Sequence, residues 1–311
     1  MSKEAYIIDG TRSAIGNFKG SLAAVRTDDL IASVIKNLIA KNPELPLDRI
    51  DDVIIGCANQ AGEDNRNIAR MALLLAGLPE SVPGETVNRL CASGMSAVAQ
   101  AMRAIKSGEG DLFIAGGVEG MSRGPFVISK AESGFATDQK MYDSSFGWRF
   151  INPEMEKTYG VEAMGKTAEN LAEMYKITRE EQDEFALNSQ MKATKAQESG
   201  RLAEEISDIQ IPQRKGDPIL VNKDEFIKPN SSLEILGKLK PAFVKENGTV
   251  TAGNASGLND GAAAMIIASG DAVNNYGLKP LAKIVCSAVV GVEPRIMGIG
   301  PVDATKLALK R

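Results

Sequence analysis

The 311-residue sequence predicts an α/β fold, because short β-branched or apolar runs alternate with longer segments of helical periodicity. Hydrophobic residues make up 43% of the chain and charged residues 24%, the balance of a folded protein rather than a disordered one. The length lies near the size at which chains divide into two domains. The expected strands are, in chain order, Ala5–Ile8, Asp52–Gly56, Glu85–Asn88, Asp111–Ala115 and Ala263–Ile267.

Two helices are expected between these strands. Apolar residues recur at three-to-four spacing from Leu30 to Ile39, which predicts an amphipathic helix. The same spacing predicts a second helix over Met95–Ile105. Gly108 follows it, at the position where a helix commonly ends in a left-handed residue.

Residues 119–250 read as an inserted loop domain. They mix polar, Pro- and Gly-bearing stretches with two expected helices, Thr167–Tyr175 and Arg179–Ser199, the latter capped by Thr178. The number of residues between the two flanking strands is far too large for an ordinary connection. We therefore expect an insertion that covers the ligand-binding face of a main unit formed by residues 1–118 and 251–270.

Residues 271–311 read as the start of a further unit. Leu281–Val290 is strand-like, a Gly- and Pro-bearing loop follows over Val292–Pro301, and Ala304–Lys310 has helical character. One strand, one loop and two helical turns cannot bury their own apolar faces. We expect this unit to be incomplete.

Composition and charge exclude several classes of protein. The net charge of −4 and the pI near 5.3 argue against nucleic acid as a partner. No apolar run approaches the ~18 residues that a membrane helix needs, so no membrane partner is expected. The N-terminus leads directly into the first strand without an apolar leader, which favours a cytoplasmic protein.

The cysteines form neither a disulfide framework nor a zinc-binding spacing, so no metal site is expected. There are three of them, Cys57, Cys91 and Cys286, and the chain contains no histidine. Cys57 and Cys286 lie in strand-like runs and are expected in the core.

Cys91 is the candidate nucleophile. It follows a predicted strand and precedes small residues and a long apolar helix, which places it on a strand-to-helix turn. The helix N-terminus favours a thiolate and offers N–H groups to an oxyanion. The alternative from local sequence is a small buried hydrophobic residue, which is the commoner role of a lone cysteine.

The chain resembles the thiolase family along essentially its whole length. Four segments resemble thiolase motifs, in the family's order and spacing: Val87-Asn-Arg-Leu-Cys-Ala-Ser-Gly-Met95, Ala115-Gly-Gly-Val-Glu-Gly-Met-Ser-Arg-Gly-Pro-Phe126, Thr249-Val-Thr-Ala-Gly-Asn-Ala-Ser-Gly-Leu-Asn-Asp-Gly-Ala262 and Gly298-Ile-Gly-Pro301. Two further segments, Gly56–Arg66 and Phe146–Pro153, are similar to the branch that acts on 3-oxoadipyl-CoA.

The resemblance implies an αβαβα layered fold, built on a mixed five-stranded sheet with helices on both faces. It also implies an acyltransferase that cleaves 3-oxoadipyl-CoA with CoA into succinyl-CoA and acetyl-CoA, through an acyl intermediate on Cys91. Coenzyme A and acyl-CoA are then substrates, and no covalently bound cofactor is expected. The resemblance further implies a homodimer or homotetramer that pairs through the first half of the fold.

Residues near coenzyme A follow from the same resemblance, position by position. Met164 would line the acyl pocket, and Lys228 would offer positive charge to a phosphate. The remaining expected contacts are Ala242, Phe243, Ala252, Gly253 and Ser256. Arg149 and Arg123 are candidates to hold the distal carboxylate of an adipyl chain.

The sequence also departs from the family pattern. Ala163 and Ile235 stand where several members have a CoA-contacting histidine and serine. The family's Asn-Glu-Ala-Phe, Gly-His-Pro and second Cys-x-Gly segments do not occur in it, and Cys286 does not match the second cysteine. From this we expect a C-terminally truncated chain with little or no thiolysis activity of its own.

Three alternatives remain open from sequence. The first is a thiolase for acetoacetyl-CoA or other 3-ketoacyl-CoA thioesters. The second is a non-catalytic acyl-CoA-binding fragment, which CoA binding without turnover would indicate. The third is a condensing enzyme of the wider superfamily, which the segment Thr251–Gly257 disfavours.

Overall fold

The computed structural model describes residues 3–311; Met1 and Ser2, which precede the first expected strand, lie outside them. The chain forms two compact units. Within the described residues, the sheet unit contains residues 3–125, Gly200–Phe226 and Leu258–Val285. The helical unit contains Phe126–Ser199, Ile227–Gly257 and Cys286–Arg311. Each unit is described by itself below.

The sheet unit contains strands, α-helices and short 3₁₀ turns. Its strands are β1 (Ala5–Arg12), β2 (Gly16–Asn17), β3 (Asp52–Gly56), β4 (Gly84–Val87), β5 (Leu112–Gly120), β8 (Ile209–Ile211), β9 (Ile219–Val221), β10 (Asn259–Ser269) and β11 (Ala282–Ile284). Its helices are α1 (Thr27–Lys41), α2 (Ile68–Ala76), α3 (Ser93–Ser107) and α8 (Gly270–Tyr276), with 3₁₀ turns at Ser21–Ala24, Leu47–Arg49, Met121–Arg123 and Leu202–Glu204.

One mixed sheet organises this unit. Its strand order is β11-β1-β10-β5-β3-β4, and β2 pairs with β10 outside this path. β10 is antiparallel to β1 and β5, whereas β3 is parallel to β5 and β4. The five strands expected from sequence are thus five neighbours in this sheet, with the short strands β2 and β11 added.

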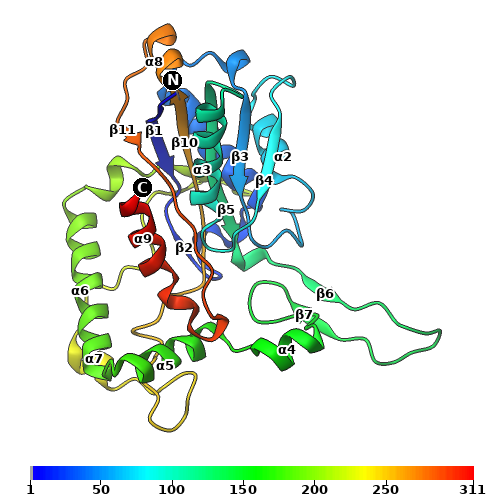
Figure 1. The fold of residues 1–311 in the computed structure, drawn as a ribbon, viewed down its shortest axis with the longest axis vertical. Helices are drawn as coiled ribbons and strands as arrows, with labels where there is room; N and C mark the ends of the chain where they lie inside the picture. The colour runs from blue at the N-terminus through cyan, green and yellow to red at the C-terminus, as the bar shows by residue number, and fades with distance from the viewer. Residues whose placement is uncertain (1–2) are drawn as a thin grey trace. The chain divides into compact units, whose positions relative to one another are not determined.

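Helices cover both faces of the sheet, as expected (Figure 1). In β3, Val53 and Ile55 belong to the core cluster that contains the apolar residues of α1 and α2. Ile54 lies between them in sequence and packs in a second cluster with Ala97, Ala101 and other residues of α3. The strict alternation follows from the two-residue period of a strand, and both faces are apolar because both are covered. Helix α3 ends at Gly108 in the left-handed conformation, φ +83°, as its position in the sequence predicts.

The helical unit carries the long insertion. Its strands are β6 (Phe126–Ile128) and β7 (Met141–Asp143), and its helices are α4 (Pro153–Tyr159), α5 (Met164–Tyr175), α6 (Arg179–Glu198), α7 (Leu233–Gly237) and α9 (Gly300–Lys310), with a 3₁₀ turn at Pro294–Ile299. Thr178 caps α6 as expected, in a capping box with Glu181 in which each side chain bonds to the other residue's backbone N–H. Among residues 3–311, no helix has both the length and the apolar character to cross a bilayer.

The units divide the chain at positions that differ from the expected boundaries. Residues 200–226 lie with the sheet unit, because Arg12 of β1 bonds to Glu205 and forms a bidentate ion pair with Asp224. Within Leu281–Val290, only Ala282–Ile284 is a strand, and it pairs with the first three residues of β1. Cys286 therefore lies beyond the strand, half-buried, with its Sγ 3.2 Å from the carbonyl oxygen of Ala308.

Candidate active site

Cys91 lies on an exposed turn between β4 and α3, where the sequence predicts it. The turn leads to Ala92, the N-cap residue, and α3 begins at Ser93. Of the three cysteines, Cys91 is the exposed one. An exposed thiol in front of a helix N-terminus has the setting of a nucleophile rather than of a core residue.

Gly56 lets α3 begin directly against the sheet. A Cβ atom at Gly56, the last residue of β3, would lie 2.2 Å from the carbonyl carbon of Ser93 and 2.4 Å from the backbone N of Gly94. Real Cβ atoms do not approach backbone this closely, so only glycine fits here. The edge of the sheet thereby fixes the position of the first turn of α3 and of the cysteine before it.

A largely buried polar cluster lies where β3 and β5 end. Ligating atoms of Cys57, Asp64 and Glu119 lie within 4.8 Å of one another. Burial raises the pKa of all three groups above their ordinary values, although backbone N–H groups of Ala58 and Asn59 donate to the Glu119 carboxylate. This cluster brings one thiol and two carboxyl groups together in a largely buried position.

The expected CoA contacts all lie in the helical unit. The N–H of Ala242 donates to the carbonyl oxygen of Val250 at 2.9 Å, which places the 241–243 segment beside the 249–251 segment. The ring of Phe243 lies over Gly165, the second residue of α5, where an added Cβ would come within 2.1 Å of it. Met164, the first residue of α5, is 60% exposed next to that contact. The structure therefore gathers Met164, Ala242 and Phe243.

The four remaining expected contacts are Ala252, Gly253, Ser256 and Lys228, and they differ in their environment. Ala252 and Ser256 are exposed, and Gly253 packs so closely on Leu236 and Leu239 that a Cβ would clash with both side chains. Lys228 is exposed, and its backbone N–H donates to the side chain of Gln190 on α6. Ala252, Gly253 and Ser256 lie on one loop, Thr249–Ser256.

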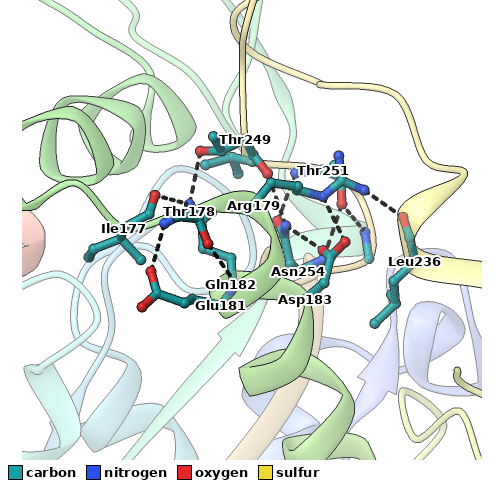
Figure 2. A network of polar contacts seen from close by, with 12 residues as sticks. Ile177, Thr178, Arg179, Glu181, Gln182, Asp183, Leu236, Thr249, Thr251 and Asn254 are labelled. Atoms are coloured by element: carbon teal, nitrogen blue, oxygen red, sulfur yellow. Dashed lines mark hydrogen bonds and ion pairs between the residues drawn. The ribbon is translucent and has the colours of Figure 1, made fainter. Parts of the chain in front are cut away.

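A polar network holds this loop, and sequence reasoning missed it (Figure 2). The buried Asp183 of α6 accepts hydrogen bonds from Asn254 at 2.9 Å and from Arg179 at 2.7 Å. Asn254 in turn donates to the carbonyl oxygen of Thr249 and accepts from the N–H of Thr251. The sequence of α6 is mostly polar, so its periodicity does not mark Asp183 as buried.

Glu169 of α5 supports the same loop from the other side. Its buried carboxylate accepts from the backbone N–H groups of Thr249 and Val250 and from the hydroxyl of Thr249. Burial alone would raise the pKa of Glu169, but these hydrogen bonds outweigh it and hold the pKa below its ordinary value. The loop is held by acidic side chains of two helices, Glu169 of α5 and Asp183 of α6.

The two arginine candidates differ in their environment. The Arg123 guanidinium forms a two-pronged ion pair with Glu63, which lowers the pKa of that carboxyl group. Its charge is therefore already matched within the sheet unit. Arg149 donates to the carbonyl oxygen of Ser144 at 3.2 Å and forms no ion pair among the described residues.

Ala163 and Ile235, which stand where several family members have a histidine and a serine, lie at the start of one helix and within another. Ala163 is the N-cap residue of α5, immediately before Met164, and is exposed. Ile235 lies on α7, is 52% exposed and donates its N–H to the side chain of Ser232.

Comparison with known proteins identifies the family. The model of the thiolase N-terminal domain matches residues 5–271. The chain is 57% identical over 311 residues to a beta-ketoadipyl-CoA thiolase of Pseudomonas knackmussii, covering 100% of this chain and 77% of that protein. It is 56% identical over 309 residues to the 3-oxoadipyl-CoA/3-oxo-5,6-dehydrosuberyl-CoA thiolase of Escherichia coli K12, covering 99% of this chain and 77% of that one.

A solved structure agrees with these sequence matches. The acetyl-CoA acetyltransferase of Bacillus anthracis superposes with a TM-score of 0.91 at 39% identity, covering 99% of this chain and 76% of that chain. The comparisons do not support the expected truncation or the inactivity that was argued from it. The family expectation is confirmed: the chain belongs to the thiolase family and is an enzyme of the acyltransferase class.

Proposed function

We propose that this chain cleaves 3-oxoadipyl-CoA with CoA, giving succinyl-CoA and acetyl-CoA through an acyl intermediate on Cys91. The observation that carries the proposal is the exposed Cys91 thiol in front of α3. The names of the relatives at 56–57% identity support the substrate. No external cofactor is required, because coenzyme A enters as a substrate.

The reaction balances with the sulfur of Cys91 as nucleophile. The thiolate attacks the C3 carbonyl carbon of 3-oxoadipyl-CoA, and the C2–C3 bond breaks. The leaving C2 carbanion takes up a proton and departs as acetyl-CoA, while the succinyl group stays on Cys91. The thiol of a second CoA loses its proton, attacks the thioester and carries the succinyl group away. The N–H groups at the start of α3 are available to stabilise the oxyanions on this path.

The helical unit supports binding of the CoA portion in this proposal. Met164 and Phe243 present exposed apolar surface, and the Thr249–Ser256 loop presents backbone next to them. Lys228 offers a cation to a phosphate group.

Arg149 is the proposed partner of the distal substrate carboxylate, because Arg123 is already paired with Glu63. Arg149→Gln should lower kcat/KM for 3-oxoadipyl-CoA about 10-fold or more, and change acetoacetyl-CoA cleavage little. Arg214→Gln, an exposed arginine of the sheet unit, is the matched control. Equal losses on both substrates would exclude a carboxylate-specific role for Arg149.

The test of the proposed function is acyl transfer to a single cysteine. The 311-residue chain is incubated with 3-oxoadipyl-CoA, and its intact mass and peptide map are measured. We expect one succinyl group on Cys91, release of acetyl-CoA, and loss of both in Cys91→Ser but not in Cys286→Ser. Transfer from acetyl-CoA or acetoacetyl-CoA without any from 3-oxoadipyl-CoA would favour the alternative that the Bacillus anthracis relative suggests. CoA binding without transfer from any thioester would contradict the enzymatic proposal.

We further propose a homodimer or homotetramer in the cytoplasm, where CoA thioesters are available. Two features of the sheet unit support self-association. β4 is a terminal strand of the sheet, and α2, which packs near it, exposes Met71, Leu74 and Leu75. Light scattering after size-exclusion chromatography gives the mass, and a monomer at micromolar concentration would contradict the proposal.

A further inference from the structure

The turn that carries Cys91 is held by two side chains that flank it. The hydroxyl of Ser93 donates to the carbonyl oxygen of Leu90 at 2.6 Å and accepts from the N–H of Arg89 at 2.8 Å. The side-chain oxygen of Asn88 accepts from the N–H of Leu90 at 2.8 Å. The N–H groups of Arg89 and Leu90 and the carbonyl oxygen of Leu90 are therefore each bonded to a side chain. The carbonyl oxygens of Arg89 and Leu90 also accept the backbone N–H groups of Ala92 and Ser93.

The backbone between these two side chains adopts a conformation that leucine rarely takes. Leu90 has φ +49°, in the left-handed region where a branched side chain is disfavoured, and 69% of it is exposed. Packing of the Leu90 side chain therefore does not enforce this conformation. Such a conformation persists only where the surroundings impose it. The side-chain bonds from Ser93 and Asn88 to Leu90 impose it here, together with the backbone bond from the N–H of Ser93 to the carbonyl oxygen of Leu90 at 3.0 Å.

Asn88 also ties the turn to the segment that follows β3. Its side-chain nitrogen donates to the carbonyl oxygen of Ala58 at 3.1 Å, and the N–H of Ala58 donates to the buried end of Glu119 at 3.0 Å. Ser93 is itself 4% exposed and lies in the first turn of α3, against Gly56. Both side chains thus connect a solvent-exposed turn to fixed parts of the fold.

From these contacts we infer that Ser93 and Asn88 are positioning residues for Cys91. They hold the Leu90 backbone in its left-handed conformation, so that the thiol stands in line with the start of α3. Neither residue needs to touch the substrate. This inference rests on the proposed function of Cys91 as the acyl acceptor. Because Ser93 is buried and makes two bonds to the turn, its loss should weaken acyl transfer more than the loss of the exposed Asn88.

The test compares transfer with simple alkylation at the same sulfur. The rate constant for acyl transfer from 3-oxoadipyl-CoA to Cys91 is measured across thioester concentrations in the 311-residue chain and in Ser93→Ala, Asn88→Ala and Asn88→Asp. Alkylation of Cys91 by iodoacetamide and the Tm are measured on each variant. Ser93→Ala should lower the maximal transfer rate constant roughly 10- to 100-fold, because a small displacement of a reacting atom has effects of that size. The half-saturating concentration and the alkylation rate should change less than about threefold, since alkylation does not require a fixed direction of approach.

Asn88→Asp keeps the oxygen that accepts from Leu90 and should retain most of the activity that Asn88→Ala loses. Ser107→Ala, at the far end of α3, and Asn275→Ala, on α8, are matched controls that should transfer at the parent rate. Equal transfer rates in the parent, Ser93→Ala and Asn88→Ala would overturn this inference alone. If the parent is alkylated at Cys91 but never acylated, the proposed function fails and this inference with it.

Discussion

The Glu169 carboxylate holds Thr249 through both the backbone N–H and the hydroxyl of that residue, at 2.7 to 3.0 Å. The same carboxylate also accepts from the N–H of Val250 at 2.8 Å. A helix and the first residues of the Thr249–Ser256 loop are thereby joined by one charged group. Because hydrogen bonds to an ionised acceptor are stronger than neutral ones, the strength of this attachment of the loop to α5 depends on the ionisation of Glu169.

The first prediction concerns stability at low pH. The folded-state pKa of Glu169 lies below that of an unfolded glutamate, about 4.3. Its stabilising contribution is therefore complete above that pH and disappears as the pH falls through the lower folded value. Glu169→Gln should lower the free energy of unfolding at pH 7 by about 1–2 kcal/mol, and the loss should shrink as the pH approaches 3. Urea unfolding at several pH values measures this.

Glu173→Gln is the control for that experiment. Glu173 lies on the same helix and is exposed, so its substitution should leave stability nearly unchanged at every pH. A difference between Glu169→Gln and the parent that stays constant from pH 7 to pH 3 would contradict the assignment of the effect to the Glu169 charge.

The second prediction concerns CoA binding by the same loop. Asn254 is tied to the buried Asp183 and to two backbone groups of the loop, so Asn254→Ala leaves three polar groups without their partner. The loop should become mobile, and the dissociation constant for CoA, measured by calorimetry, should rise roughly 10-fold or more. Alkylation of Cys91 should be unchanged, because that residue lies in the sheet unit.

An exposed asparagine of α6 provides the comparison. Asn188→Ala removes the same side chain from a solvent-facing position and should bind CoA like the parent. If Asn254→Ala binds CoA with parental affinity, the loop does not take part in CoA binding or does not depend on this network.

The third prediction concerns the approach of α3 to the sheet. Gly56→Ala places a methyl group within 2.2 to 2.6 Å of backbone atoms of Ser93 and Gly94, which cannot move independently of the helix. We expect a loss of about 2–3 kcal/mol in unfolding free energy, typical of overpacking, and slower acyl transfer because the start of α3 is displaced. Gly134→Ala, at a position where an added Cβ meets nothing within 4 Å, should be neutral. Parental stability of Gly56→Ala would contradict the close packing.

The sequence predicts the central strands of the sheet better than the segments around them. Strands such as β3 and β5 are buried on both faces, so each is a continuous apolar run that periodicity detects. Leu281–Val290 has a similar composition, yet only Ala282–Ile284 pairs, with the first three residues of β1. A propensity for extended structure does not reveal where a partner strand ends.

In the candidate site too, the sequence predicts some residues and not others. Cys91 follows from local pattern, since a strand, small residues and a helix stand in order around it. Glu169 and Asp183 do not, because their partners in the Thr249–Asn254 segment are about 70 or 80 residues away along the chain. Charged residues on polar helices usually face solvent, and only the tertiary structure shows that these two are buried.

The last prediction separates the three thiols by their reactivity. Burial raises the pKa of the Cys57 thiol far above its ordinary value, and the neighbouring carboxyl groups of Glu119 and Asp64 raise it further. Thiolate is the form that reacts with alkylating agents, so Cys57 should resist iodoacetamide at pH 8. Cys91 is exposed and should be labelled at least about 100-fold faster than Cys57, while the half-buried Cys286 should react at an intermediate rate.

Peptide mapping by mass spectrometry over time measures the three rate constants in one sample. Adding urea to unfold the chain should bring the rate at Cys57 up to that of Cys91, because burial is the cause of its inertness. Cys91→Ser should abolish the fast phase and leave the other two rates unchanged. Fast labelling of Cys57 in the folded chain, or slow labelling of Cys91, would show that the thiol at the start of α3 is not the accessible one, and the acyl-transfer proposal would lose the observation that carries it.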